Sequence, residues 1–198
     1  MKTTLSLCMF VKTSKMTTDI FEGRPNPEHA PTYARYYFER TAGNTQLLDT
    51  LKKNKLEIAA FIRSIPEEKI DFQYAEGKWS TKSVIAHIID TERIFQYRAL
   101  RLSRKDDSPI PGFEEDWFAS QANTDCRTME NLAQEFEIVR ESSIQLFHYM
   151  TMSMLDFIGT ASNQPLTARG AGWIMIGHAV HHRGIITERY LVDTEEIY

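Results

Sequence analysis

The stretch S-T-K-S-V-I-A-H-I-I-D-T-E-R-I-F-Q-Y-R-A-L-R, residues 80–101, gives a clear indication of the fold class of this chain. Its apolar residues recur with the period of an α-helix, and Ser80 is a good N-cap, so we predict a helix from Ser80 to about Ser103. Ser83 stands where a complete capping box has Glu or Gln. Strand signals are scarce in the rest of the chain, because no β-branched stretch alternates regularly with polar residues.

Three further segments have the same helical period. They cover about 44–64, about 129–153 after Thr128, and about 168–191 after Thr167. Pro66 ends the first of them, because proline lacks the amide hydrogen and clashes with the preceding turn. Together the four helices predict an all-α fold, a four-helix bundle.

The connection between the second and third helices is long and contains prolines, a glycine and several acidic residues. Loops of this length are uncommon in a compact domain unless they cross it or serve a site. We therefore predict that residues 105–127 form a crossover with a turn or two of helix near Trp117. Residues 1–30 are predicted to be an irregular N-terminal extension, and residues 31–198 the bundle domain.

Composition limits the functions that are open to this chain of 198 residues. A net charge of −4 without a basic cluster argues against nucleic acid as a partner. No run approaches the roughly 18–20 apolar residues that span a bilayer, so no membrane partner is predicted. Cys8 and Cys126 make no disulfide framework, which fits a reducing compartment, and we expect a cytoplasmic protein. The first residues make a poor signal peptide, and Met16 competes with Met1 as the start.

The motif G-H-A-V-H-H-R-G, residues 177–184, carries the chemistry of the fourth predicted helix. His178 and His182 are four residues apart, which places their Cβ atoms about 5–6 Å apart on one helix face. His181 is rotated from His182 by about 100° and lies at the edge of that face. His87, on the apolar second helix, is the candidate for a third ligand of a divalent metal. The alternative is that these histidines lie in the core or on the surface and form ordinary hydrogen bonds.

Other polar residues near His87 have two interpretations each. Asp90 could orient a ligand imidazole or be a fourth ligand, but it could equally form an ion pair on the helix surface. Arg98, Arg101 and Arg189 could contact an anionic substrate, or they could bind carboxylates of the same fold. Imidazole ligands suit Zn²⁺, Ni²⁺, Fe²⁺ or Mn²⁺, so one divalent transition metal of open identity is predicted.

Five short motifs resemble the DinB/YfiT-like superfamily of metal-dependent proteins. They are G-K-W-S at 77–80, H-I-I-D-T-E-R-I-F-Q-Y-R-A-L-R at 87–101, P-I-P-G-F at 109–113, G-H-A-V-H-H-R-G at 177–184 and E-R-Y-L at 188–191. The resemblance implies a four-helix bundle with a long crossover. It also implies a metal site made of His87, His178 and His182, which leaves His181, Asp90 and Arg98 as candidates for contacts around the ligands.

Three functional hypotheses remain open at this point. The resemblance favours a metal-dependent enzyme that transfers a low-molecular-weight thiol to an electrophile, because a metal that lowers a thiol pKa favours the nucleophilic thiolate. Metal-dependent hydrolysis is the alternative enzyme, with Asp90 or Glu92 as candidate general base. A non-catalytic metal-binding or small-ligand-binding module is the third. The expected partner is a small-molecule substrate, and a homodimer is expected by analogy.

Overall fold

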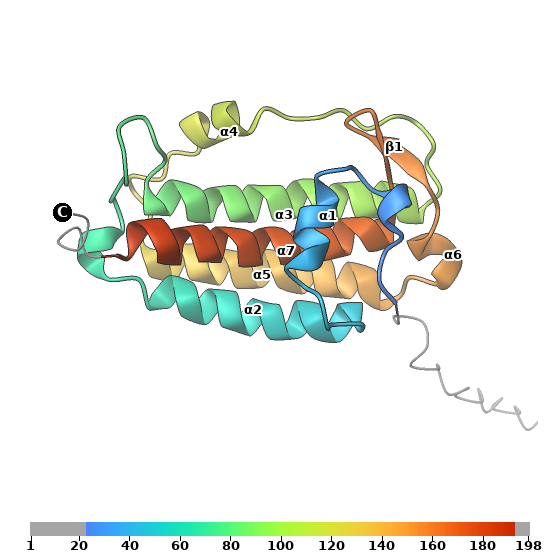
Figure 1. Cartoon of the computed structure of the whole chain (residues 1–198), viewed down its shortest axis with the longest axis horizontal. Coiled ribbons are helices and arrows are strands. Elements are labelled where there is room, and N and C mark those ends of the chain that lie inside the picture. Colours follow the sequence, from blue (N-terminus) through green and yellow to red (C-terminus); the bar gives the residue numbers. More distant parts are fainter. Residues whose placement is uncertain (1–22, 193–198) are drawn as a thin grey trace, which may run out of the picture.

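Four long helices lie side by side along the length of the protein (Figure 1). The structure is a computed structural model that describes residues 23–192. The four helices are α2 (Leu47–Arg63), α3 (Thr81–Ser103), α5 (Met129–His148) and α7 (Ala168–Ile185). Both α2 and α3 pack against α5 and α7. The predicted all-α fold, a four-helix bundle, is confirmed.

The helices α3, α5 and α7 each begin directly after a hydroxyl residue, which is Ser80, Thr128 or Thr167. In each case the hydroxyl oxygen accepts the amide hydrogen of the residue three positions on, at 2.9–3.2 Å. The helix α5 ends at His148, earlier than predicted, because the backbone leaves the helical conformation at Tyr149. A separate short helix, α6 (Met152–Leu155), follows it.

The crossover between α3 and α5 runs along the whole bundle, so these two helices point in the same direction (Figure 1). It carries the short helix α4 (Glu115–Gln121), which includes Trp117, as predicted. A 3₁₀ turn, η3 (Glu67–Lys69), lies in the connection between α2 and α3. Because the crossover lies over α3 and α4 contacts that helix, its residues can reach a site on α3.

A small antiparallel hairpin lies in the connection between α6 and α7, and the sequence did not predict it. Its strands are β1 (Gly159–Ala161) and β2 (Gln164–Leu166). Ser162 and Asn163 form the turn with φ of +50° and +61°, the left-handed conformation that tight hairpin turns require. Strands of three residues are too short to show a period in the sequence. The hairpin contacts the crossover, where Ile110 bridges to Ala161.

The N-terminal part of the described chain packs across α7 (Figure 1). It contains a 3₁₀ turn, η2 (Pro27–His29), and the short helix α1 (Ala34–Glu39). The approach is close because α7 has a glycine there: a Cβ at Gly177 would lie 2.3 Å from the carbonyl oxygen of Tyr37. Most of the predicted extension, residues 1–22, lies outside the described residues. The boundary at residue 30 stays a prediction.

Buried apolar side chains form two clusters, one toward each end of the bundle. Between them each main helix contributes a buried polar residue: Asn54, Glu92, Arg140 and His178. A polar layer of this kind is costly unless its groups find partners, so it marks the place to look for a site. Among the described helices, none is long and apolar enough to cross a membrane. At its C-terminal end α7 continues through a turn of π-helix, η4 (Ile186–Tyr190).

Candidate metal centre

Three histidine side chains meet between α3 and α7. His87 lies on α3, and His178 and His182 lie one turn apart on α7. One ring nitrogen of each lies within 4.8 Å of the others, and the three ring centroids are 4.4–4.9 Å apart. The Nε2 atoms of His87 and His178 are 3.0 Å apart. The structure therefore brings the three predicted ligands together.

Burial favours the neutral form of these imidazoles. Desolvation lowers the pKa of His87 to about 4. Desolvation, with a smaller contribution from the neighbouring His87 and His181, lowers the pKa of His182 to about 3. The pKa of the deeply buried His178 is also lowered, by desolvation first and by the neighbouring histidines second. Neutral imidazole is the form that binds metal, so the site is ready to bind at neutral pH.

A divalent ion fits the residues that are present. His182 Nδ1 is buried and has no hydrogen-bond partner, which is a costly state for a polar atom. The group consists of imidazoles alone, and in the described part of the chain no Asp, Glu or Cys joins it. Imidazole nitrogens that converge in this way suit a cation such as Zn²⁺, Ni²⁺, Fe²⁺ or Mn²⁺, which would replace the hydrogen bond between His87 and His178.

A pocket of about 360 Å³ opens beside the histidines, and His87 and His178 form part of its wall. Its other lining residues come from the N-terminal segment, α3, the crossover, the hairpin turn and α7. They are Tyr33, Tyr37, Thr91, Phe95, Arg98, Phe113, Glu115, Ser162 and Ile174. The crossover and the hairpin therefore complete a site that the main helices begin.

Polar atoms without partners gather around this pocket. Thr91 Oγ1 and Arg98 Nε are buried and lack a hydrogen bond, as does His182 Nδ1. No other buried side-chain nitrogen or oxygen of the described residues lacks one. Since most buried polar groups in proteins are paired, this concentration beside one cavity is typical of a binding site.

The other predicted site residues do not belong to the group of three histidines, although the ring centroid of His181 lies 4.9 Å from that of His182. Asp90 forms an ion pair with Arg93 at 3.7 Å, and in the described residues no hydrogen bond joins it to a histidine of the cluster. The hydroxyl of Tyr36 and His181 Nδ1 are 3.1 Å apart, so His181 is engaged on the outer side of α7. Glu92 is occupied by a buried ion pair with Arg140, so it is not free to serve as a base.

The three arginines that could have met an anionic substrate differ in their surroundings. Arg98 lines the pocket, and its Nη2 donates to Ser162 Oγ at 2.9 Å. Arg101, three residues later, forms an ion pair with Asp106 at 2.6 Å. Arg189 is exposed and lies over the ring of Tyr74. Of these three, Arg98 alone reaches the pocket.

Two pocket residues had no signal in the sequence. Glu115 reaches the pocket because the crossover folds back over α3, and Ser162 reaches it because the hairpin turn lies against the crossover. Two tyrosines of the N-terminal segment, Tyr33 and Tyr37, also line the pocket. Burial raises the pKa of Tyr37 to about 12, so its hydroxyl is a hydrogen-bond donor at the pocket wall.

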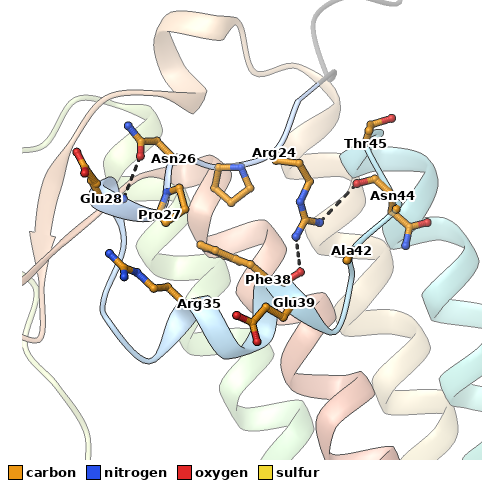
Figure 2. A pocket seen from close by; sticks show the side chains of 12 residues that line it. Arg24, Asn26, Pro27, Glu28, Arg35, Phe38, Glu39, Ala42, Asn44 and Thr45 are labelled. Carbon is orange, nitrogen blue, oxygen red and sulfur yellow. Dashed lines mark hydrogen bonds between the residues drawn. The ribbon is translucent and has the colours of Figure 1, made fainter.

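A larger hollow of about 780 Å³ lies elsewhere, between the N-terminal segment and α1 (Figure 2). Arg24 lies at its wall, but this guanidinium already donates to the carbonyl oxygens of Phe38 and Thr41. None of the unpartnered buried atoms of the described residues lies in it. Size alone therefore does not make it the better candidate.

Comparison with known proteins places the fold and the site in a family. The model of the DinB superfamily matches residues 50–186. A protein of Oceanobacillus iheyensis, named a putative metal-dependent hydrolase, is 28% identical over 96 residues, which are 48% of this chain and 54% of that protein. This chain thus aligns with about half the length of that relative.

A solved structure supports the fold independently. YfiT from Bacillus subtilis is described as a probable metal-dependent hydrolase with an unusual four-helix bundle topology. It superposes with a TM-score of 0.64 at 15% identity, over 84% of this chain and 91% of YfiT. At this identity the likeness is one of fold alone. Because the family model spans more than half of the sequence, this chain belongs to the DinB superfamily.

Proposed function

We propose that this protein is a metal-dependent hydrolase whose single divalent ion is held by His87, His178 and His182. The observation that carries the proposal is the convergence of three neutral imidazoles beside an open pocket. Three protein ligands and an open side are typical of catalytic sites, whereas structural sites are closed by a fourth ligand. The two relatives, one named a putative and the other a probable metal-dependent hydrolase, support the same reaction class.

Some residues of the chain hold the metal ion, and others position the substrate. The two helices fix the histidines, and the crossover, α1 and the hairpin turn shape the pocket in which a substrate lies. When bound, the ion supplies Lewis acidity that activates water or polarises a substrate oxygen at neutral pH. Burial of the histidines keeps protons from competing for the ring nitrogens.

We assign the role of proton acceptor to the carboxylate of Glu115. It lines the pocket, whereas Asp90 and Glu92 are each engaged by an arginine outside it. Glu115 lies in the first turn of α4 and is exposed, so solvent can take up the proton that it accepts. A positioned carboxylate of this kind accelerates hydrolysis by about 10²–10⁴-fold in known enzymes.

Thiol-dependent transfer and non-catalytic binding stay predictions that one experiment separates from hydrolysis. Tag-free full-length protein is stripped with a chelator, reloaded with Zn²⁺, Ni²⁺, Mn²⁺ or Fe²⁺, and analysed for metal. Each form is then assayed on 4-nitrophenyl acetate, 4-nitrophenyl phosphate and leucine 4-nitroanilide without thiol. A parallel assay measures conjugation of 1-chloro-2,4-dinitrobenzene with N-acetylcysteine. We expect about one equivalent of metal and thiol-independent turnover of at least one ester or amide.

Two neighbouring histidines provide the matched control. His182→Ala removes a proposed ligand and should bind less than about 0.2 equivalents of metal, whereas His181→Ala, on the next residue of the same helix, should bind as the wild type does. Glu115→Gln should keep the metal and lose turnover. Turnover that requires N-acetylcysteine would favour the thiol transferase, and bound metal without any turnover would favour the binding module. No recoverable metal would refute the site itself.

A further inference from the structure

The inference concerns Arg98, which stands apart from the other buried arginines of the described chain. Arg98, Arg140 and Arg169 are each at most 4% exposed. Arg140 pairs with Glu92 at 2.7 Å, and Arg169 pairs with Asp156 at 2.6 Å. Within the same described residues, Arg98 has no carboxylate in ion-pair distance. A buried guanidinium without a counter-charge is costly, since its charge has lost the hydration of bulk water.

Neutral groups hold Arg98 in place without cancelling its charge. Nη2 donates to Ser162 Oγ at 2.9 Å and to the carbonyl oxygen of Pro111 at 3.4 Å. The guanidinium carbon lies 4.7 Å from the ring centroid of Phe95. Nε remains without an acceptor. The hydroxyl of Tyr33 is a further hydrogen-bond partner of the guanidinium. Neutral groups from two loops and two aromatic residues thus fix the side chain, while its charge lacks a carboxylate and Nε lacks an acceptor.

The position of Arg98 indicates which groups a bound ligand contacts. Arg98 and His87 lie on the same helix, three turns apart, and both line the pocket of about 360 Å³. Between them Thr91 offers an unpartnered hydroxyl and Phe95 an apolar ring. Tyr33, Tyr37 and Phe113 add three further rings. The volume is near the lower end of the range for small-molecule sites, so the occupant is small.

We propose that the pocket recognises a small substrate that carries an anionic group, a carboxylate or a phosphate, on an apolar body. The anion binds Arg98 through Nε, and the apolar body lies among the aromatic rings, with its far end at the histidines. Arginine is suited to this task because it stays charged and donates in a fixed planar geometry. This inference rests on the proposed function only for the reaction at the far end, since Arg98 binds the anion whether or not a metal is bound.

Three probes of similar shape test the anion requirement. Phenylacetate carries a carboxylate, phenyl phosphate carries a phosphate, and phenylacetamide is neutral. Each is titrated by calorimetry into metal-free full-length protein, and again into zinc-loaded protein. We expect at least one anion to bind the metal-free protein at least tenfold more tightly than phenylacetamide does. The anion that binds more tightly identifies the group that Arg98 recognises.

Two arginines on α3 make a matched pair of variants. Arg98→Met should weaken anion binding at least tenfold, and Arg101→Met should leave it unchanged because Arg101 is engaged by Asp106 outside the pocket. Arg98→Lys keeps the charge without the Nε donor and should lose affinity several-fold, which keeps the test informative if Arg98→Met fails to fold. Equal binding of phenylacetamide, unchanged binding to Arg98→Met and Arg98→Lys, or binding of neither anion would each overturn the proposal.

A fourth variant separates this inference from the proposed function. His182→Ala should lose metal but should still bind the anion in the metal-free state, because Arg98 and the pocket wall are unchanged. If the wild type binds no metal and still discriminates between the anions and phenylacetamide, the metal site fails and the anion subsite stands. If metal binds and drives hydrolysis while Arg98→Met has no effect on anion binding, the metal site stands and the anion subsite fails.

Discussion

Two sets of buried polar side chains cross the middle of the same bundle, and they differ in how their atoms are partnered. Glu92 accepts two hydrogen bonds from Arg140, at 2.7 and 2.8 Å, and a third from Ser143 at 2.7 Å. Arg140 also donates to Asn54 at 2.6 Å. None of these side chains has a buried atom without a partner. The network joins α2, α3 and α5.

The second set, on the side of the bundle that faces α1 and the crossover, is incomplete. His182, Thr91 and Arg98 each have a buried polar atom without a hydrogen bond, and ring nitrogens of the three histidines converge. Since both sets contain buried polar groups, burial alone does not distinguish structure from function here. What distinguishes them is whether each buried polar atom has a hydrogen-bond partner. The complete network stabilises the fold, whereas the incomplete set has atoms available to a ligand.

The largest effect predicted by this comparison is the loss of one partner from the complete network. Arg140→Met leaves the carboxylate of Glu92 buried without its counter-ion. Glu92→Gln likewise leaves the guanidinium of Arg140 buried without a counter-ion. Each should lower the free energy of unfolding by about 3–5 kcal/mol. Urea unfolding followed by circular dichroism measures it. Arg93→Met, which breaks an exposed pair with Glu135, is the control and should cost less than about 1 kcal/mol.

The next effect is stabilisation of the incomplete set by its ligand. Zinc that binds only the folded protein should raise the free energy of unfolding by about 2.7 kcal/mol at a concentration of 100 times Kd. The thermal midpoint of chelator-treated protein should therefore rise when Zn²⁺ is added. His87→Ala and His182→Ala should not respond, whereas His181→Ala should. A rise of equal size in all of them would mean that zinc binds elsewhere.

An effect that is smaller per pH unit follows from the pKa of the buried histidines in the metal-free protein. Burial lowers the pKa of His87 to about 4, whereas an exposed histidine in the unfolded chain has a pKa of about 6.5. Between these values the unfolded chain binds a proton that the folded protein does not bind. The contribution is complete above about pH 6.5 and is lost as the pH falls toward 4, by up to about 1.4 kcal/mol per pH unit.

Stability curves at several pH values check this dependence. Denaturant titrations of the metal-free wild type from pH 7 to pH 4.5 should lose stability more steeply than those of His87→Gln, which has no proton to bind at that position. His29→Gln is a suitable control, because His29 lies in the N-terminal segment away from the cluster. Identical slopes for the wild type and His87→Gln would show that His87 is not held neutral by the fold.

A feature of this protein could be predicted from its sequence where local interactions determine it, and not where tertiary contacts do. The starts of α3, α5 and α7 were predictable because a hydroxyl cap and a helical period are local features. The histidine pair on α7 was predictable for the same reason, since a spacing of four fixes one face. The end of α5 and the three-residue strands of the hairpin were missed, because tertiary contacts rather than local preference set them.

Arg98 shows the limit within the site itself. In the sequence, Arg98 and Arg101 are alike: both are arginines near the end of the same predicted helix, three residues apart. Only the folded chain places Asp106 beside Arg101 and leaves Arg98 facing a pocket. Glu115 is a similar case, because its place at the pocket depends on the path of a long crossover that no local pattern determines.

The smallest effect on stability should come from Arg98, which belongs to the incomplete set. Arg98→Met removes a buried charge that has no carboxylate partner, so it leaves no counter-ion behind and gains an apolar side chain of similar length. The loss of its hydrogen bonds to Ser162 and Pro111 offsets that gain. The free energy of unfolding should therefore change by less than about 1 kcal/mol, against the loss expected for Arg140→Met. Urea unfolding of both variants under the same conditions makes the measurement, and equal destabilisation would mean that Arg98 is as much a part of the fold as Arg140.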